Sequence, residues 1–121
     1  MVQVKGMNTG KRVRVVFYRT EGCNEPVRDW LKELGKPDSL WVGEAIKLVE
    51  YGWPVGMPTC RPMGDGLFEV RVNLPGNRTA RILFCLAGGL MGLLHGFIKK
   101  TRATPKEDLD LALKRKKDIE G

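Results

Sequence analysis

The sequence has few of the residues from which metal centres and disulfide scaffolds are built. Its 121 residues include one histidine and three cysteines, and Cys23, Cys60 and Cys85 form no Cys-x-x-Cys pair. An odd number of widely spaced cysteines indicates reduced thiols. This ligand set does not make a structural zinc framework within one chain. We therefore expect no metal and no other cofactor, with an oxygen-ligand magnesium site left open.

A long uninterrupted apolar run is also absent. The most apolar stretch, residues 82–94, contains three glycines and a turn-like Ala87-Gly88-Gly89, which predicts two strands and not a membrane span. The first residues contain no apolar segment of signal-peptide length. We therefore expect a cytoplasmic protein that does not contact a membrane. Its length predicts a single domain, placed over residues 13–121. Residues 1–12 precede the first strand pattern and are expected to be flexible.

Acidic residues are the scarcer charge. The chain has 14 acidic and 21 basic residues, for a net charge of +7, and residues 99–117 alone hold eight basic and three acidic side chains. Such a segment favours phosphate-rich partners through counterion release, although cations near a helix C-terminus also suit the helix dipole. The candidate RNA-binding side chains are Glu69, Arg102, Lys106, Lys114, Arg115, Lys116 and Lys117.

The first half of the chain predicts a strand and two helices. Residues 13–18 (VRVVFY) are rich in β-branched and aromatic side chains, as strands are. A helix capped by Asn24 should end at Gly35, and a second should run from Asp38 or Ser39 to about Gly52. We expect the two helices to form a hairpin, with both Trp30 and Trp41 in the core. The second apolar face comprises Trp41, Val42, Ala45, Ile46, Leu48 and Val49.

The second half predicts strands and a last helix. Residues 53–66 hold three prolines and three glycines, which favours a loop. Strand patterns over residues 67–74, 79–86 and 90–98 have short connectors and should pair antiparallel. The final helix begins with Thr104 as its cap and Pro105 in its first turn. The fold class is therefore α+β, an antiparallel sheet with an N-terminal helical hairpin and a C-terminal helix.

Alternation along two of these strands brings polar side chains together. Arg71 shares a strand face with Glu69, and Arg81 shares the corresponding face of the next strand. Because neighbouring strands are about 5 Å apart, the two arginines would form a fixed positive site for a phosphate, oriented by Glu69. Solvated surface arginines paired with Glu69 are the alternative.

His95 lies in an apolar strand and has two interpretations. Met91, Leu93, Phe97 and Lys99 are spaced from it by period two, as around a packed core histidine. Imidazole also suits proton transfer at neutral pH, and the neighbouring Lys99 and Lys100 favour that second role.

Two segments carry a resemblance to a known family. They read DGLFEVRV and ARILFCLAGGLMGLLHGFIKKTRATPKEDLDLALKRKKD, and they resemble the HigB-like, phage-derived branch of the RelE/ParE toxin superfamily. The likeness extends over the first strand, the helical pair and the YGWPVGMP segment, and so covers about residues 12–119.

The resemblance implies a compact RelE-like domain and a toxin of a type II toxin–antitoxin system that cleaves messenger RNA, commonly in the ribosomal A site. It implies a cognate antitoxin, usually with a helix-turn-helix domain, bound in a toxin–antitoxin hetero-oligomer. By position, Arg81 matches the phosphate-stabilising arginine, Arg71 a basic residue of the preceding strand, and Lys99 or Lys100 the basic residue after the last strand. His95 and Glu69 also fit the pattern, whereas Ala80 and Leu109 replace aromatic residues of some relatives.

We expect metal-independent endoribonuclease activity, in which the RNA 2′-hydroxyl attacks the adjacent phosphate. The catalytic candidates are Arg71, Arg81, His95, Lys99 and Lys100. A ParE-like toxin that inhibits gyrase is the alternative within the superfamily, and it would need no phosphate-cleaving cluster. A non-catalytic RNA-binding module would account for the charge and the sheet arginines.

Overall fold

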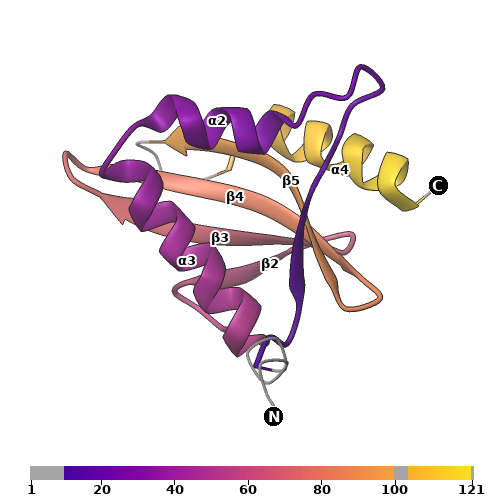
Figure 1. Cartoon of the computed structure of the whole chain (residues 1–121), viewed down its shortest axis with the longest axis horizontal. Coiled ribbons are helices and arrows are strands. Elements are labelled where there is room, and N and C mark those ends of the chain that lie inside the picture. Colours follow the sequence, from indigo (N-terminus) through magenta and orange to yellow (C-terminus); the bar gives the residue numbers. More distant parts are fainter. Residues whose placement is uncertain (1–9, 100–103, 121) are drawn as a thin grey trace, which may run out of the picture.

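The computed structural model describes residues 10–99 and 104–120. The described chain forms an α+β domain with three helices and five strands, drawn in Figure 1. The elements in chain order are β1 (Arg14–Phe17), α2 (Pro26–Leu34), α3 (Asp38–Gly52), β2 (Cys60–Gly64), β3 (Leu67–Leu74), β4 (Arg78–Ala87), β5 (Leu90–Lys99) and α4 (Lys106–Glu120).

The sheet is mixed, with the order β1-β5-β4-β3-β2. The hairpins β3-β4 and β4-β5 are antiparallel as predicted, but β1 runs parallel to β5. The predicted α+β class is confirmed, but the sheet is mixed and not wholly antiparallel. Two helices follow β1 before the next strand, and so long a connection leaves its direction free.

The segment predicted as a loop over residues 53–66 contains a strand, β2. Its residues pair antiparallel with β3, with an irregularity between Pro62 and Gly64. A central strand forms hydrogen bonds with neighbours on both sides, and proline has no N–H to donate to either. β2 lies at the edge of the sheet and pairs with β3 alone. The proline that argued against a central strand is therefore compatible with an edge strand.

The helices lie in two layers around the sheet, with α2 and α3 on one face and α4 on the other (Figure 1). The larger core lies under the helical hairpin, where Val42 and Val49 pack with Ile82 and Phe84. The smaller core lies under α4 and comprises Tyr18, Leu67, Leu83, Cys85, Leu94 and Ala112. Each strand of the central hairpins therefore buries side chains on both faces.

The tryptophans differ in their environments. Trp30 is half-buried against the core, as predicted, and Trp53 meets Phe68 and Phe84 edge-on at centroid distances of 5.1 and 5.8 Å. Trp41 is 53% exposed and Leu48 54%. The broad apolar face predicted for α3 was therefore too broad, because only one stripe of a helix can face a flat sheet.

A bulge in β5 changes the alternation around His95. Leu83 pairs with His95, whereas the next residue of β4, Phe84, pairs with Leu93. Leu94 is thus an extra residue, and it packs under α4 while Leu93 packs under the hairpin. His95 follows Leu94 on the α4 face, so the predicted period-two grouping with Met91 and Leu93 was wrong.

Part of the N-terminal segment expected to be flexible, residues 1–12, is held by Glu50. The Glu50 carbonyl accepts hydrogen bonds from the backbone N–H groups of Arg12 (2.7 Å) and Val13 (3.1 Å). Its buried carboxylate accepts one from Val15 at 2.8 Å. Residues 1–9 lie outside the described part of the chain. None of the described helices is both long enough and apolar enough to cross a membrane.

The three thiols are expected to differ sharply in reactivity. Cys23 is exposed, whereas Cys60 and Cys85 are buried, and burial raises the pKa of Cys60 to about 11. Because the thiolate is the reacting species, iodoacetamide near neutral pH should modify Cys23 alone in the folded chain and all three thiols after unfolding. Mass spectrometry counts the adducts. Rapid modification of a second thiol in the folded chain would contradict this packing.

Candidate functional site

The strand register gathers three arginines on the α4 face of the sheet. Arg71 of β3 stands opposite Arg81 of β4, on the one face that the alternation predicted for both. Arg61 of β2 stands opposite Glu69 of β3. Paired residues of neighbouring strands lie about 5 Å apart, so all four side chains fall within one small area. We call these residues, together with Thr104, the arginine cluster.

Glu69 lies at the centre of the cluster and is completely buried. Its Oε1 lies 3.8 Å from Nε of Arg71 and 3.9 Å from Nε of Arg61, and its Oε2 lies 3.9 Å from Nη1 of Arg81. Oε1 accepts no hydrogen bond within the described residues. Glu69 was predicted to bind RNA, but a carboxylate without exposed surface holds the arginines in place instead.

Thr104 connects the segment before α4 to the cluster. Its hydroxyl donates a short hydrogen bond to Oε2 of Glu69 and accepts one from Nη1 of Arg81 at 3.0 Å. The prediction that Thr104 caps the last helix was therefore wrong. The helix begins at Lys106, and its first hydrogen bonds run from the N–H groups of Asp108 and Leu109 to the Pro105 carbonyl, so Pro105 and not Thr104 precedes the first helical residue.

The three arginines differ in their access to a ligand. The side chains of Arg61 and Arg71 are 33% and 27% exposed, whereas that of Arg81 is 1% exposed. Burial lowers the pKa of Arg81, and the Glu69 carboxylate opposes that shift. The guanidinium surface accessible from solvent is therefore provided by Arg61 and Arg71, and Arg81 lies buried beneath it. The sequence had assigned this surface to Arg71 and Arg81.

His95 stands at the edge of the cluster with a carboxylate partner. Its Nε2 lies 2.7 Å from Oδ1 of Asp108 on α4, and its ring stacks on Phe97 with 5.2 Å between centroids. Phe97 is opposite Arg81 in the register. The imidazole is 17% exposed, so it is neither a fully buried core residue nor a free surface group.

The remaining predicted basic residues are spread along the same face. Lys99 ends β5 opposite Thr79 and is half-buried. Lys106 is exposed and pairs with Asp110 at 3.3 Å. Lys100 and Arg102, predicted as catalytic and RNA-binding residues, lie outside the described part of the chain.

Within the basic run of α4, two side chains contact the rest of the fold. Arg115 donates to the Leu94 carbonyl at 2.8 Å and lies over the Tyr18 ring. Lys116 lies against the β2-β3 turn, so close that a side chain at Gly66 would meet its Cε at 2.9 Å. Lys114 and Lys117 are exposed. The run is thus divided between structural contacts and solvated charge.

The sequence analysis missed Arg61 and Asp108 as site residues, and it assigned Thr104 to the helix cap and not to the arginine cluster. Arg61 was placed in a loop because residues 53–66 hold three prolines and three glycines. In the structure the buried Cys60 and the partly exposed Arg61 alternate as in an edge strand. The pairing of Asp108 with His95 had no local signal, because the two lie on different elements.

The arrangement can bind a phosphate through two guanidinium groups and exchange a proton through a carboxylate-held imidazole. Within the described ranges, no three His, Cys, Asp or Glu side chains form a group that could hold a metal ion.

A comparison with family models matches residues 29–117 to the family described as Phage derived protein Gp49-like (DUF891). The chain belongs to this family. The Gp49-like family is associated with the toxins of toxin–antitoxin systems. The match covers every residue of the arginine cluster and the His95–Asp108 pair, and the fold is compatible with a RelE-like domain. No curated protein matches the chain.

Proposed function

We propose that this Gp49-like chain is a cytoplasmic toxin that cleaves messenger RNA on the ribosome without a metal ion, and that a helix-turn-helix antitoxin binds it in a hetero-oligomer. The observation that carries the proposal is the arginine cluster beside the His95–Asp108 pair. Two partly exposed guanidinium groups and an imidazole on one sheet face are what cleavage by an internal hydroxyl needs. A protein that only binds gyrase needs no such grouping.

The chemistry follows from the charges that develop. The RNA 2′-oxygen forms a bond to the adjacent phosphorus, His95 takes the hydroxyl proton, and the bond from phosphorus to the 5′-oxygen breaks. Arg61 and Arg71 neutralise the additional negative charge of the pentacoordinate phosphorane. Arg81 acts as a positioning residue through Glu69 and Thr104. Lys99 ends the last strand and Lys100 follows it in the sequence, and the ammonium group of either can donate a proton to the 5′-oxygen as it leaves.

The chemical ends of the products test this mechanism. We expect a 2′,3′-cyclic phosphate, or the 3′-phosphate formed from it, opposite a 5′-hydroxyl, with cleavage unchanged by a chelator that leaves ribosomes intact. Mass spectrometry of the fragments identifies the ends. A 3′-hydroxyl opposite a 5′-phosphate would indicate metal-assisted hydrolysis by water instead.

The biological target is tested by inducing the chain in cells. Loss of messages with intact DNA supports RNA cleavage. A DNA damage response with intact messages would support the ParE-like alternative, and growth arrest with neither would support RNA binding alone. The experiment therefore separates the three functions that the sequence left open.

Asp108 should contribute to the rate through His95. Asp108→Asn is expected to lower kcat about tenfold with little change in KM, because the carboxylate holds the imidazole and stabilises its protonated form in the transition state. Asp110→Asn is the matched control, since Asp110 is exposed and pairs with Lys106. Equal effects of the two substitutions would remove Asp108 from the mechanism.

A further inference from the structure

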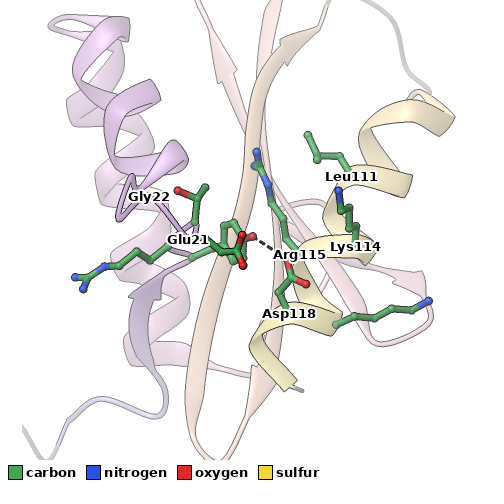
Figure 2. A pocket seen from close by; sticks show the side chains of 10 residues that line it. Glu21, Gly22, Leu111, Lys114, Arg115 and Asp118 are labelled. Atoms are coloured by element: carbon green, nitrogen blue, oxygen red, sulfur yellow. Dashed lines mark hydrogen bonds between the residues drawn. The ribbon is translucent and has the colours of Figure 1, made fainter.

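A groove lies away from the arginine cluster, between the segment that follows β1 and the C-terminal half of α4. Its volume is about 910 Å³. Figure 2 shows Glu21 and Gly22 on one side and Leu111 and Lys114 on the other. At 1.5 Å per helical residue, Lys114 is about 9 Å along α4 from Asp108, which marks the cluster end of the helix. The groove and the cluster are therefore separate surfaces.

The floor of the groove is fixed by hydrogen bonds. The Tyr18 hydroxyl donates to Oδ2 of Asp118 at 2.8 Å (Figure 2), and this bond raises the pKa of Tyr18. The Arg115 guanidinium lies 5.3 Å from the centroid of the Tyr18 ring and donates to the Leu94 carbonyl. The Asp118 carboxylate already has a partner, so a ligand meets a preformed surface.

The rim of the groove is basic. Lys114 and Lys117 are exposed, and neither forms an ion pair with another described residue. Arg19 is 63% exposed at its side chain and pairs with Glu25 at 3.3 Å. Glu21 is the exposed carboxylate on the opposite wall. The rim of the groove therefore has a net positive charge.

An apolar cavity of about 290 Å³ continues this groove. It shares Tyr18, Arg19 and Asp118 with the basic part. Its other lining includes three large apolar side chains that remain partly exposed, namely Val16 at 41%, Leu90 at 42% and Ile119 at 39%. Partly exposed large apolar side chains gathered in one concave place mark a binding surface.

We propose that this two-part groove binds an acidic peptide segment carrying one bulky apolar residue. The apolar side chain enters the cavity between Val16, Leu90 and Ile119, and the carboxylates meet Lys114 and Lys117. This inference rests on the proposed function, under which the peptide segment is part of the antitoxin. A peptide segment held here would occupy a surface separate from the arginine cluster.

RNA fits this surface less well, although Lys114 and Lys117 were predicted to bind it. A phosphate backbone has no apolar side chain to place in the apolar cavity and gains nothing from it. An acidic amphipathic peptide uses both parts of the groove, and the net charge of +7 speeds its approach.

The probe is a displayed library of random peptides about a dozen residues long, selected on the full chain and then measured singly by fluorescence polarisation. We expect enriched peptides to combine Asp or Glu with a large apolar residue. The double variant Lys114→Glu, Lys117→Glu should weaken their binding at least about tenfold, and Ile119→Asp should do the same. Lys36→Glu, Lys47→Glu is the matched control, because it makes the same charge change at two exposed lysines away from the groove. Thermal unfolding verifies that each variant is folded.

Two outcomes would overturn the proposal. One is peptide binding that is unchanged in both groove variants or is lost only in Trp41→Ala, which would place binding on the exposed face of α3. The other is an RNA oligonucleotide that loses affinity in the groove variants while the selected peptides keep theirs. The peptide measurement contains no RNA, so failure of the cleavage mechanism would leave its result unaffected.

Discussion

Replacing Glu69 with alanine is expected to lower the free energy of unfolding by about 3–5 kcal/mol, because it leaves a buried charge without its counterion. The Arg81 side chain is 1% exposed, and it lies 3.9 Å from the Glu69 carboxylate and donates a hydrogen bond to Thr104. Arg61 and Arg71 would also lose the carboxylate that lies between them. Urea unfolding measures the loss.

The matched control for this prediction removes both charges. Glu69→Leu combined with Arg81→Met fills the same space with apolar atoms, and such replacements of buried pairs are often close to neutral. We expect the double variant to be more stable than either single variant. Additive losses in the double variant would show that the two side chains act independently and would contradict the central place of Glu69.

Replacing Arg71 with alanine is expected to slow RNA cleavage about a hundredfold, which corresponds to about 3 kcal/mol of transition-state stabilisation. Its side chain is 27% exposed, so the same substitution should change the free energy of unfolding by less than about 1 kcal/mol. A large loss of rate without a large loss of stability is the signature of a group that acts on the substrate.

Two further variants sharpen this prediction. Arg14→Ala removes an exposed arginine from another strand of the sheet, β1, and should leave cleavage unchanged. Arg71→Lys keeps the charge but loses the fork of N–H donors, and its rate should fall between those of the wild type and Arg71→Ala. A rate loss in Arg14→Ala as large as in Arg71→Ala would indicate a general effect of net charge instead.

Arg81→Ala is expected to reduce stability and cleavage together. Its loss leaves the Glu69 carboxylate buried with one fewer cation and removes a hydrogen bond to Thr104. The resemblance had implied only a phosphate-stabilising role for Arg81. Burial changes that expectation, and Arg71 becomes the more informative position for a test of catalysis.

The buried carboxylate also explains how so small a domain can hold arginines at fixed positions. Long side chains on an open sheet move freely, and ordering them on substrate binding costs conformational entropy. Here the sheet register and Glu69 fix the guanidinium groups in advance. Preorganised charge of this kind is effective in transition-state stabilisation.

The sequence by itself determined the local elements and part of the site. The hydrophobic periodicity located α2, α3 and the strands β3, β4 and β5. The antiparallel pairing of these strands followed from their short connectors, which allow no other geometry. Alternation within those strands was enough to place Arg71 and Arg81 on one face of the sheet, and the register of the hairpin then pairs them directly.

Only the tertiary structure decided the contacts between distant segments. Glu69 contacts Arg61, which lies on the edge strand that Pro62 made hard to predict. It also contacts Thr104, which is 35 residues later in the sequence. His95 meets Asp108 because a one-residue bulge turns Leu94 and then the imidazole toward α4. Burial of Arg81 and exposure of Trp41 depend on which elements cover each face of the sheet. Periodicity records which face a residue shares with its neighbours, whereas a site is made by residues that only packing brings together.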